Sequence, residues 1–286
     1  MPKICAIIVT YHPDNQVFEN LENIYKQVDK IVIVDNTPAQ EVEILQKITE
    51  NYSEVEIIYN ADNLGIAKAL NQGVKYVIEE GFDWVLTMDQ DSTLTENMVA
   101  NMFVAYDKYE KKEQVGILSP IYLDKFTKNL SYKGEKEILE LEAGLTSGQL
   151  VKTELFEKCG FFREDYFIYH VDTEYCLRVR KNGYKILQIK SAVLLHEEGK
   201  QTKHSFLWKK GAITTNHSPF ARYYITRNTI FLMKEYFFIY PKYILKTVLD
   251  LKINTLKIIL FEDNKFNKIL AELKGIWDSF IVINNK

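Results

Sequence analysis

The segment from Trp84 to Ser92 places two carboxylates directly after an apolar run. Trp84-Val85-Leu86-Thr87-Met88 is followed by Asp89-Gln90-Asp91. Two like charges at this spacing resist burial unless a cation or a hydrogen-bond donor compensates them. Mg²⁺ prefers oxygen ligands and is usually held by one or two carboxylates together with substrate phosphates. The pair predicts a metal site, although an Asp here could also cap the helix expected near Thr95.

A second polar segment, Asn63-Leu64-Gly65, stands where an expected strand turns into a helix. Gly65 would allow the backbone to approach a ligand closely, and a helix N-terminus favours anionic groups. Both residues could equally be plain turn residues. The segment is neither a G-x-G-x-x-G motif nor a P-loop, so neither dinucleotide binding nor ATP hydrolysis follows.

A third acidic position, Asp172, stands at the start of an expected helix. The helix dipole would keep its carboxylate ionised, as a general base requires, and an N-cap role is the alternative. Glu174 could orient an acceptor or pair with Arg178 four residues on.

Short apolar runs alternate with helical patterns over the first 120 residues. The alternation predicts an α/β fold with a mostly parallel, doubly wound sheet flanked by helices. In such sheets, ligands bind at the carboxyl ends of the strands, where the polar residues gather. The expected strands are 4–10, 30–35, 55–60, 84–89 and 115–120, and the expected helices between them are 17–28, 41–52 and 65–81.

Charge is distributed unevenly along the 286 residues. The net charge is −3, which argues against a general nucleic-acid binder. Residues 220–286 carry 11 Lys/Arg against 6 Asp/Glu, so the remainder carries −8. Neither a signal peptide nor a transmembrane helix is expected, and the cysteines Cys5, Cys159 and Cys176 are interpreted as buried thiols. A cytoplasmic protein is expected, with a basic tail suited to an anionic surface.

The sequence contains six motifs in a fixed order: IIVTYHPD (7–14), IVIVDN (31–36), NLGIAKALNQG (63–73), MDQDS (88–92), TSGQLV (146–151) and YHVDTEYCLRVRKNGYKI (169–186). They span about two thirds of the chain, and together they resemble glycosyltransferase family 2 enzymes with the GT-A fold. The DQDS and VDTEYCLR forms resemble the rhamnosyltransferase branch, which uses dTDP-L-rhamnose.

The resemblance implies roles for individual residues. Asp91 would ligate Mg²⁺ or Mn²⁺, Asp89 would contact the ribose or metal region, and His196 could complete the metal shell. Asp172 would be the catalytic base, with Val171 where the family usually has Glu. The implied donor-site residues are Thr10, Tyr11 and Asp35 for the nucleoside, Asn63, Gly65 and Lys68 near base, ribose or phosphate, and Ser147 and Gly148 where donor sugar and acceptor meet.

The C-terminal segment reads as two or three amphipathic helices broken near Pro241. Arg222 and Arg227 resemble a segment that could bind a donor or acceptor diphosphate, and solvated surface charges are the alternative. The helices could lie on the inner face of the cell membrane, pack on the domain, or form a homodimer. The expected domains are 1–219, for nucleotide-sugar binding and catalysis, and 220–286.

The resemblance therefore implies an inverting, metal-dependent transfer of L-rhamnose to a saccharide acceptor, which could be linked to a polyprenyl diphosphate. The product would be a cell-surface polysaccharide. Three alternatives stay open: the same fold with a UDP-hexose donor, a sugar nucleotidyltransferase, and a non-catalytic nucleotide-sugar-binding module. The last is disfavoured because both Asp91 and Asp172 are present.

Overall fold

The computed structural model describes residues 2–38, 42–196, 201–206 and 209–281. The chain divides into two compact units, one formed by Met1–Phe167 and Val171–Glu197 and the other by Ile168–His170 and Glu198–Lys286. The expected domain boundary between residues 219 and 220 therefore falls inside the second unit.

The first unit is built on a nine-stranded sheet, counted over the described residues. Its order is β3-β2-β1-β4-β8-β6-β9-β5, with β7 paired to β9. Strands β1 to β4 run parallel, β8 lies antiparallel between β4 and β6, and β9 runs parallel to β6. The strands are β1 (Ile4–Thr10), β2 (Lys30–Asp35), β3 (Val55–Tyr59), β4 (Trp84–Asp89), β5 (Thr93–Leu94), β6 (Val115–Asp124), β7 (Ile138–Leu141), β8 (Gln149–Lys152) and β9 (Lys185–His196).

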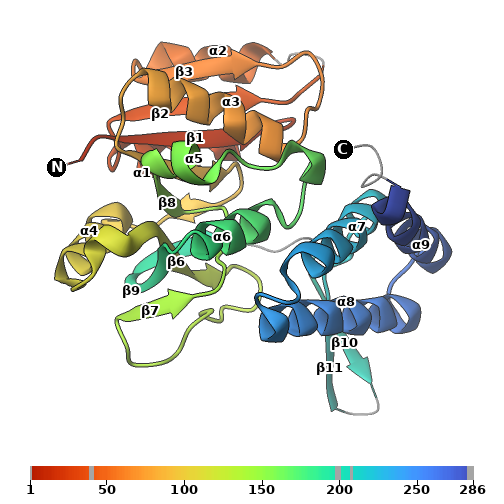
Figure 1. Ribbon diagram of the computed structural model, residues 1–286. Coiled ribbons are helices and arrows are strands. Elements are labelled where there is room, and N and C mark those ends of the chain that lie inside the picture. Colours follow the sequence, from red (N-terminus) through yellow and green to blue (C-terminus); the bar gives the residue numbers. More distant parts are fainter. Residues whose placement is uncertain (1, 39–41, 197–200, 207–208, 282–286) are drawn as a thin grey trace. The chain divides into compact units, whose positions relative to one another are not determined.

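Helices cover both faces of this sheet, which explains its continuous apolar strands. Ala6 and Ile8 join a core with residues of α1, α2 and α4, whereas the Ile7 side chain meets Gly73 of α3 on the other face. Figure 1 shows α3 lying across strands β1 and β2. A Cβ at Gly73 of α3 would lie 2.6 Å from Ile7 Cγ2, so only glycine permits this approach. The helices are α1 (Gln16–Tyr25), α2 (Val42–Asn51), α3 (Ile66–Glu79), α4 (Met98–Lys108), α5 (Glu154–Cys159) and α6 (Val171–Lys181), with 3₁₀ turns η1 (Lys112–Gln114) and η2 (Glu164–Tyr166).

The five expected strands and the expected α/β class are confirmed, and the three expected helices form within a few residues of their expected ends. The three cysteines are buried and unpaired, as expected.

The second unit contains a hairpin and the C-terminal helices. Its elements are β10 (Thr202–Phe206), β11 (Lys209–Thr214), α7 (Pro219–Tyr236), α8 (Pro241–Phe261) and α9 (Lys265–Ile281). Pro219 and Pro241 each occupy the first helical position, where a missing N–H costs nothing. The expected break near Pro241 is thus the start of α8. Among the described helices, none combines the length and apolar character needed to cross a bilayer.

Candidate active site

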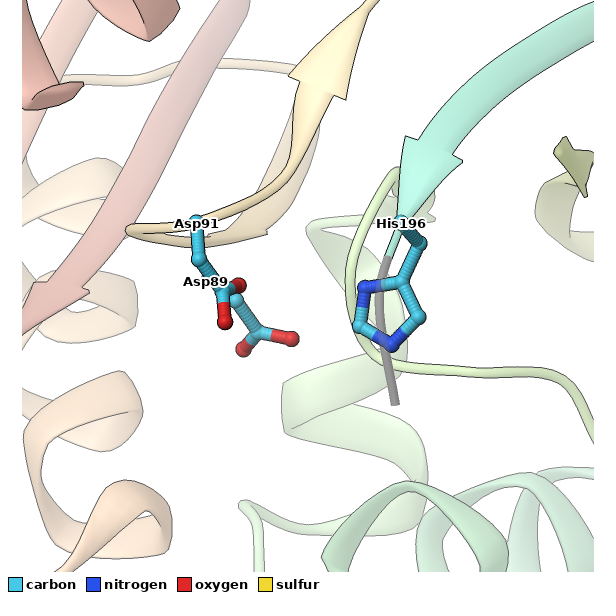
Figure 2. A group of neighbouring side chains, drawn as sticks. All are labelled: Asp89, Asp91 and His196. Carbon is cyan, nitrogen blue, oxygen red and sulfur yellow. The ribbon is translucent and has the colours of Figure 1, made fainter. Parts of the chain in front are cut away.

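Asp89, Asp91 and His196 come together at the carboxyl end of the sheet. Their candidate ligand atoms, carboxylate oxygens and an imidazole nitrogen, all lie within 4.8 Å of one another. Figure 2 shows the two carboxylates and the imidazole facing the same space. The short strand β5 produces this arrangement, because it pairs Thr93 with Leu195 and so brings the end of β9 beside the Asp89–Asp91 turn.

Residues around the cluster orient its members. His196 Nδ1 lies 2.9 Å from Oγ of the buried Ser92. If Nδ1 carries the proton, Nε2 presents its lone pair, which is the usual arrangement of a metal-ligating histidine. Lys125 donates from Nζ to the Asp91 carbonyl oxygen at 2.7 Å, and this bond stabilises the Asp89–Asp91 turn.

The electrostatics of Asp89 also suit a cation. Burial, followed by the charges of Asp91 and Asp172, raises the pKa of Asp89 to about 7. A divalent cation between Asp89 and Asp91 would remove that repulsion, and two carboxylates with one imidazole are a donor set that Mg²⁺ or Mn²⁺ accepts. The residues present therefore fit the metal that the resemblance implied.

Asp172 is linked to this cluster through the segment that enters β8. Its Oδ2 accepts a hydrogen bond from the Thr146 backbone N–H at 3.1 Å, and its Oδ1 accepts one from Thr173 N–H at 2.6 Å. The next residue, Ser147, accepts the Asp89 backbone N–H at 3.1 Å through its Oγ. Thr146 and Ser147, which are consecutive in the chain, thus connect the first turn of α6 to the Asp89–Asp91 turn.

The end of β2 contains a buried carboxylate with an unused oxygen. Asp35 is 1% exposed, and its Oδ1 accepts hydrogen bonds from the hydroxyls of Thr10 at 2.8 Å and Thr37 at 2.9 Å. No described residue donates to its Oδ2. Because a buried acceptor without a partner is costly, this oxygen is suited to an N–H or O–H of a bound ligand.

Gln90 connects the end of β1 to the Asp89–Asp91 turn. Its side-chain amide accepts the Tyr11 backbone N–H at 2.8 Å and donates to the Tyr11 carbonyl at 3.2 Å. Tyr11 itself is 46% exposed, so its ring is accessible to a ligand.

The backbone at Gly65 is closely approached by another part of the protein, Phe167. The φ of Gly65 is +83°, and a Cβ there would meet the Phe167 ring at 2.6 Å, so the close approach is to Phe167. The Asn63 side chain accepts the Gly65 N–H at 3.0 Å, and the first N–H of α3, at Ile66, donates to the Phe167 carbonyl. Lys68 is exposed on α3. Gly148 donates its N–H to the Thr87 carbonyl, which fixes the segment beside β4.

Three residues considered for the acceptor or a diphosphate have protein partners. Glu174 is buried and forms a two-point ion pair with Arg178, which was the alternative considered for it. In the second unit, buried Arg222 pairs with Glu272, and the Arg227 guanidinium bonds the Asn228 side chain. These contacts account for the burial of all three side chains without a ligand.

Sequence reasoning missed three contributors. Ser92 ends the MDQDS motif, but it is the fold that places its hydroxyl against His196. Gln90 bonds the Tyr11 backbone across 79 positions of the chain, and Lys125 approaches Asp91 across 34, so neither residue has a local sequence signal.

Comparison with known proteins agrees with this geometry. The model of glycosyl transferase family 2 matches residues 5–170. The chain is 29% identical to the dTDP-rhamnosyl transferase RfbF of Shigella flexneri, over 96% of this chain and 95% of that protein. It also resembles the structure of the Pyrobaculum calidifontis mannosyltransferase PcManGT with GDP-Man and Mn²⁺, with a TM-score of 0.60, 15% identity, and coverage of 97% of this chain and 88% of the other. It also resembles the structure of GalNAc-T7 with UDP, GalNAc and Mn²⁺, with a TM-score of 0.60 and 12% identity. That match covers 82% of this chain and 49% of the other. The fold is GT-A, and the chain belongs to glycosyltransferase family 2.

Proposed function

We propose that this glycosyltransferase moves L-rhamnose from dTDP-L-rhamnose to a saccharide hydroxyl, with inversion at the anomeric carbon. The observation that carries the proposal is the convergence of Asp89, Asp91 and His196 beside Asp172 at one end of the sheet. One ligand set and one separate base are what a single displacement at a metal-bound diphosphate requires.

Asp91 and His196 would hold Mg²⁺ or Mn²⁺ together with Asp89. Bound there, the metal supplies positive charge that stabilises the departing nucleoside diphosphate. Ser92 and Lys125 keep the two ligands oriented through their bonds to His196 and to the Asp91 carbonyl. Asp35 would accept a hydrogen bond from the nucleoside through its unpaired Oδ2.

Asp172 would act as the base. Its carboxylate takes the proton from the acceptor hydroxyl while the hydroxyl oxygen bonds to the anomeric carbon and the bond from that carbon to the diphosphate breaks. The N–H groups of Thr146 and Thr173 stabilise the carboxylate and fix its direction. Because no covalent enzyme intermediate forms, one base suffices, unlike the carboxylate pair of glycosidases.

The rhamnose donor is supported by similarity to a dTDP-rhamnosyl transferase over nearly the whole chain. A UDP-hexose is the second candidate, because the structurally similar GalNAc-T7 was determined with UDP. A sugar nucleotidyltransferase has less support, since the sequence lacks a Gly-rich triphosphate loop near its N-terminus. The acceptor we propose is a polyprenyl-diphosphate-linked saccharide at the inner face of the cell membrane.

The test is release of nucleoside diphosphate by purified protein with Mn²⁺ or Mg²⁺, for dTDP-rhamnose and for a series of UDP-hexoses. We expect metal-dependent release from dTDP-rhamnose that is lost in Asp91→Asn and Asp172→Asn. Asp83→Asn is the matched control, because Asp83 is exposed and its carboxylate accepts the Lys3 backbone N–H, a bond that the Asn oxygen can also accept. Release from a UDP-hexose alone would contradict the donor, and release that persists in Asp172→Asn would contradict the assigned base.

A further inference from the structure

Helix α9 has its polar and apolar faces reversed relative to an ordinary surface helix. A soluble protein usually buries the apolar face of an amphipathic helix and exposes the polar one. In α9, Lys268, Glu272 and Ser279 are buried. The opposite side exposes large apolar side chains at a spacing of three or four residues: Phe266, Leu270, Leu273, Trp277 and Phe280.

Contacts within the second unit determine this orientation. The buried face of α9 forms ion pairs from Glu272 to Arg222 of α7 and from Lys268 to Glu262 after α8. Lys234 of α7 donates to the Ser279 carbonyl at 2.7 Å. Turning α9 over would leave these charges buried without partners, which costs several kcal/mol per ion.

Close helix packing adds a steric constraint. A Cβ at Gly275 would lie 2.6 Å from the Tyr223 carbonyl oxygen of α7. The two helices can therefore approach this closely because Gly275 has no side chain. The apolar side of α9 therefore faces outward as a consequence of specific packing.

Helix α8 exposes a second apolar row. The row consists of Leu245, Leu249, Ile253, Leu256 and Leu260. The opposite side of α8 carries the buried residues Ile244 and Ile258. Phe238, between α7 and α8, is 92% exposed. Apolar surface of this extent on one small unit indicates an interaction site.

The charges beside these rows point to the partner. The exposed charged residues of α8, α9 and their connection are Lys242, Lys246, Lys252, Lys265 and Lys274, against Asp250 and Asp263. Exposed Trp, Phe and Leu combined with lysines are typical of helices that lie in the interface of an anionic bilayer. In a dimer formed through the same faces, the positively charged lysines of the two copies would approach and repel one another.

We propose that the exposed faces of α8 and α9 form a docking surface for an anionic lipid bilayer, with both helices lying along it. The leucine and aromatic side chains would enter the acyl boundary, and the lysines would contact the headgroups. This surface would hold the enzyme at the membrane whichever sugar it transfers.

The experiment is sedimentation of the full chain with vesicles of phosphatidylcholine alone, or of phosphatidylcholine with phosphatidylglycerol, at low and high salt. We expect binding to the anionic vesicles that weakens in salt. Leu270→Ser/Trp277→Ser should abolish it, whereas Val104→Ser, which changes an exposed apolar residue of α4, should not. Lys265→Gln/Lys274→Gln should weaken binding by about fivefold per lysine.

Because the substituted side chains are exposed, circular dichroism should show native folding in each variant. The mass of the lipid-free protein, measured by light scattering, tests the alternative that a second copy of the chain covers these faces in a dimer. A dimer that dissociates in Leu270→Ser/Trp277→Ser would overturn the proposal, as would a native protein that does not bind anionic vesicles. These outcomes are independent of transferase activity.

Discussion

Replacing Asp35 by Asn should separate nucleotide binding from folding stability. Asp35 Oδ1 accepts two threonine hydroxyls, whereas Oδ2 is buried without a described partner. Asn is isosteric and keeps an oxygen for the two hydroxyls, so we expect the free energy of unfolding to change by less than about 1 kcal/mol. The NH₂ group would then replace Oδ2 and face the ligand with donors.

The loss in binding follows from the interaction removed. A hydrogen bond to a charged group contributes about 1.5–3 kcal/mol, so dTDP affinity should fall by about 10- to 150-fold. Isothermal titration calorimetry with dTDP and Mn²⁺ measures the affinity, and thermal unfolding of the ligand-free protein measures stability. Asp83→Asn should change neither quantity. If Asp35→Asn bound dTDP as tightly as the native protein, Oδ2 would have no role in nucleoside recognition.

Three further changes test other parts of the structure. Gln90→Ala removes both hydrogen bonds to the Tyr11 backbone, so the donor KM should rise by about tenfold with little change in kcat; steady-state kinetics in which kcat alone falls would refute this role. Burial, followed by the charge of Arg222, lowers the pKa of His217 to about 4, so only the unfolded chain gains a proton there as pH falls from about 6.5. Stability should therefore decrease towards pH 4 by at most about 3 kcal/mol, and urea unfolding of His217→Gln should show a weaker pH dependence. Gly275→Ala places a Cβ 2.6 Å from the Tyr223 carbonyl and should destabilise the second unit by about 1–3 kcal/mol in thermal unfolding; unchanged stability would mean that α7 and α9 can separate without cost.

The scaffold of the first unit was predictable because its signals are local. A strand covered on both faces must be apolar along its length, and a helix must repeat its apolar residues every three or four positions, so each run specifies its own element. Strand β1 begins and ends where expected, as do β2 and β4. The position of β8 between β4 and β6 has no such local signal, because pairing order depends on segments far apart in the chain.

The sequence by itself determined which residue types could do chemistry, and the tertiary structure decided which of them meet. The spacing of Asp89 and Asp91 predicts a metal site, and the pairing of β5 with β9 is what brings His196 beside them. Composition likewise indicated an amphipathic C-terminus. The tertiary contacts decided that the polar face of α9 turns inward and leaves its apolar face exposed: the buried ion pairs of Glu272 with Arg222 and of Lys268 with Glu262, and the close approach of α7 at Gly275. Periodicity reveals the two faces of a helix, whereas the choice between them depends on the partners that each face finds.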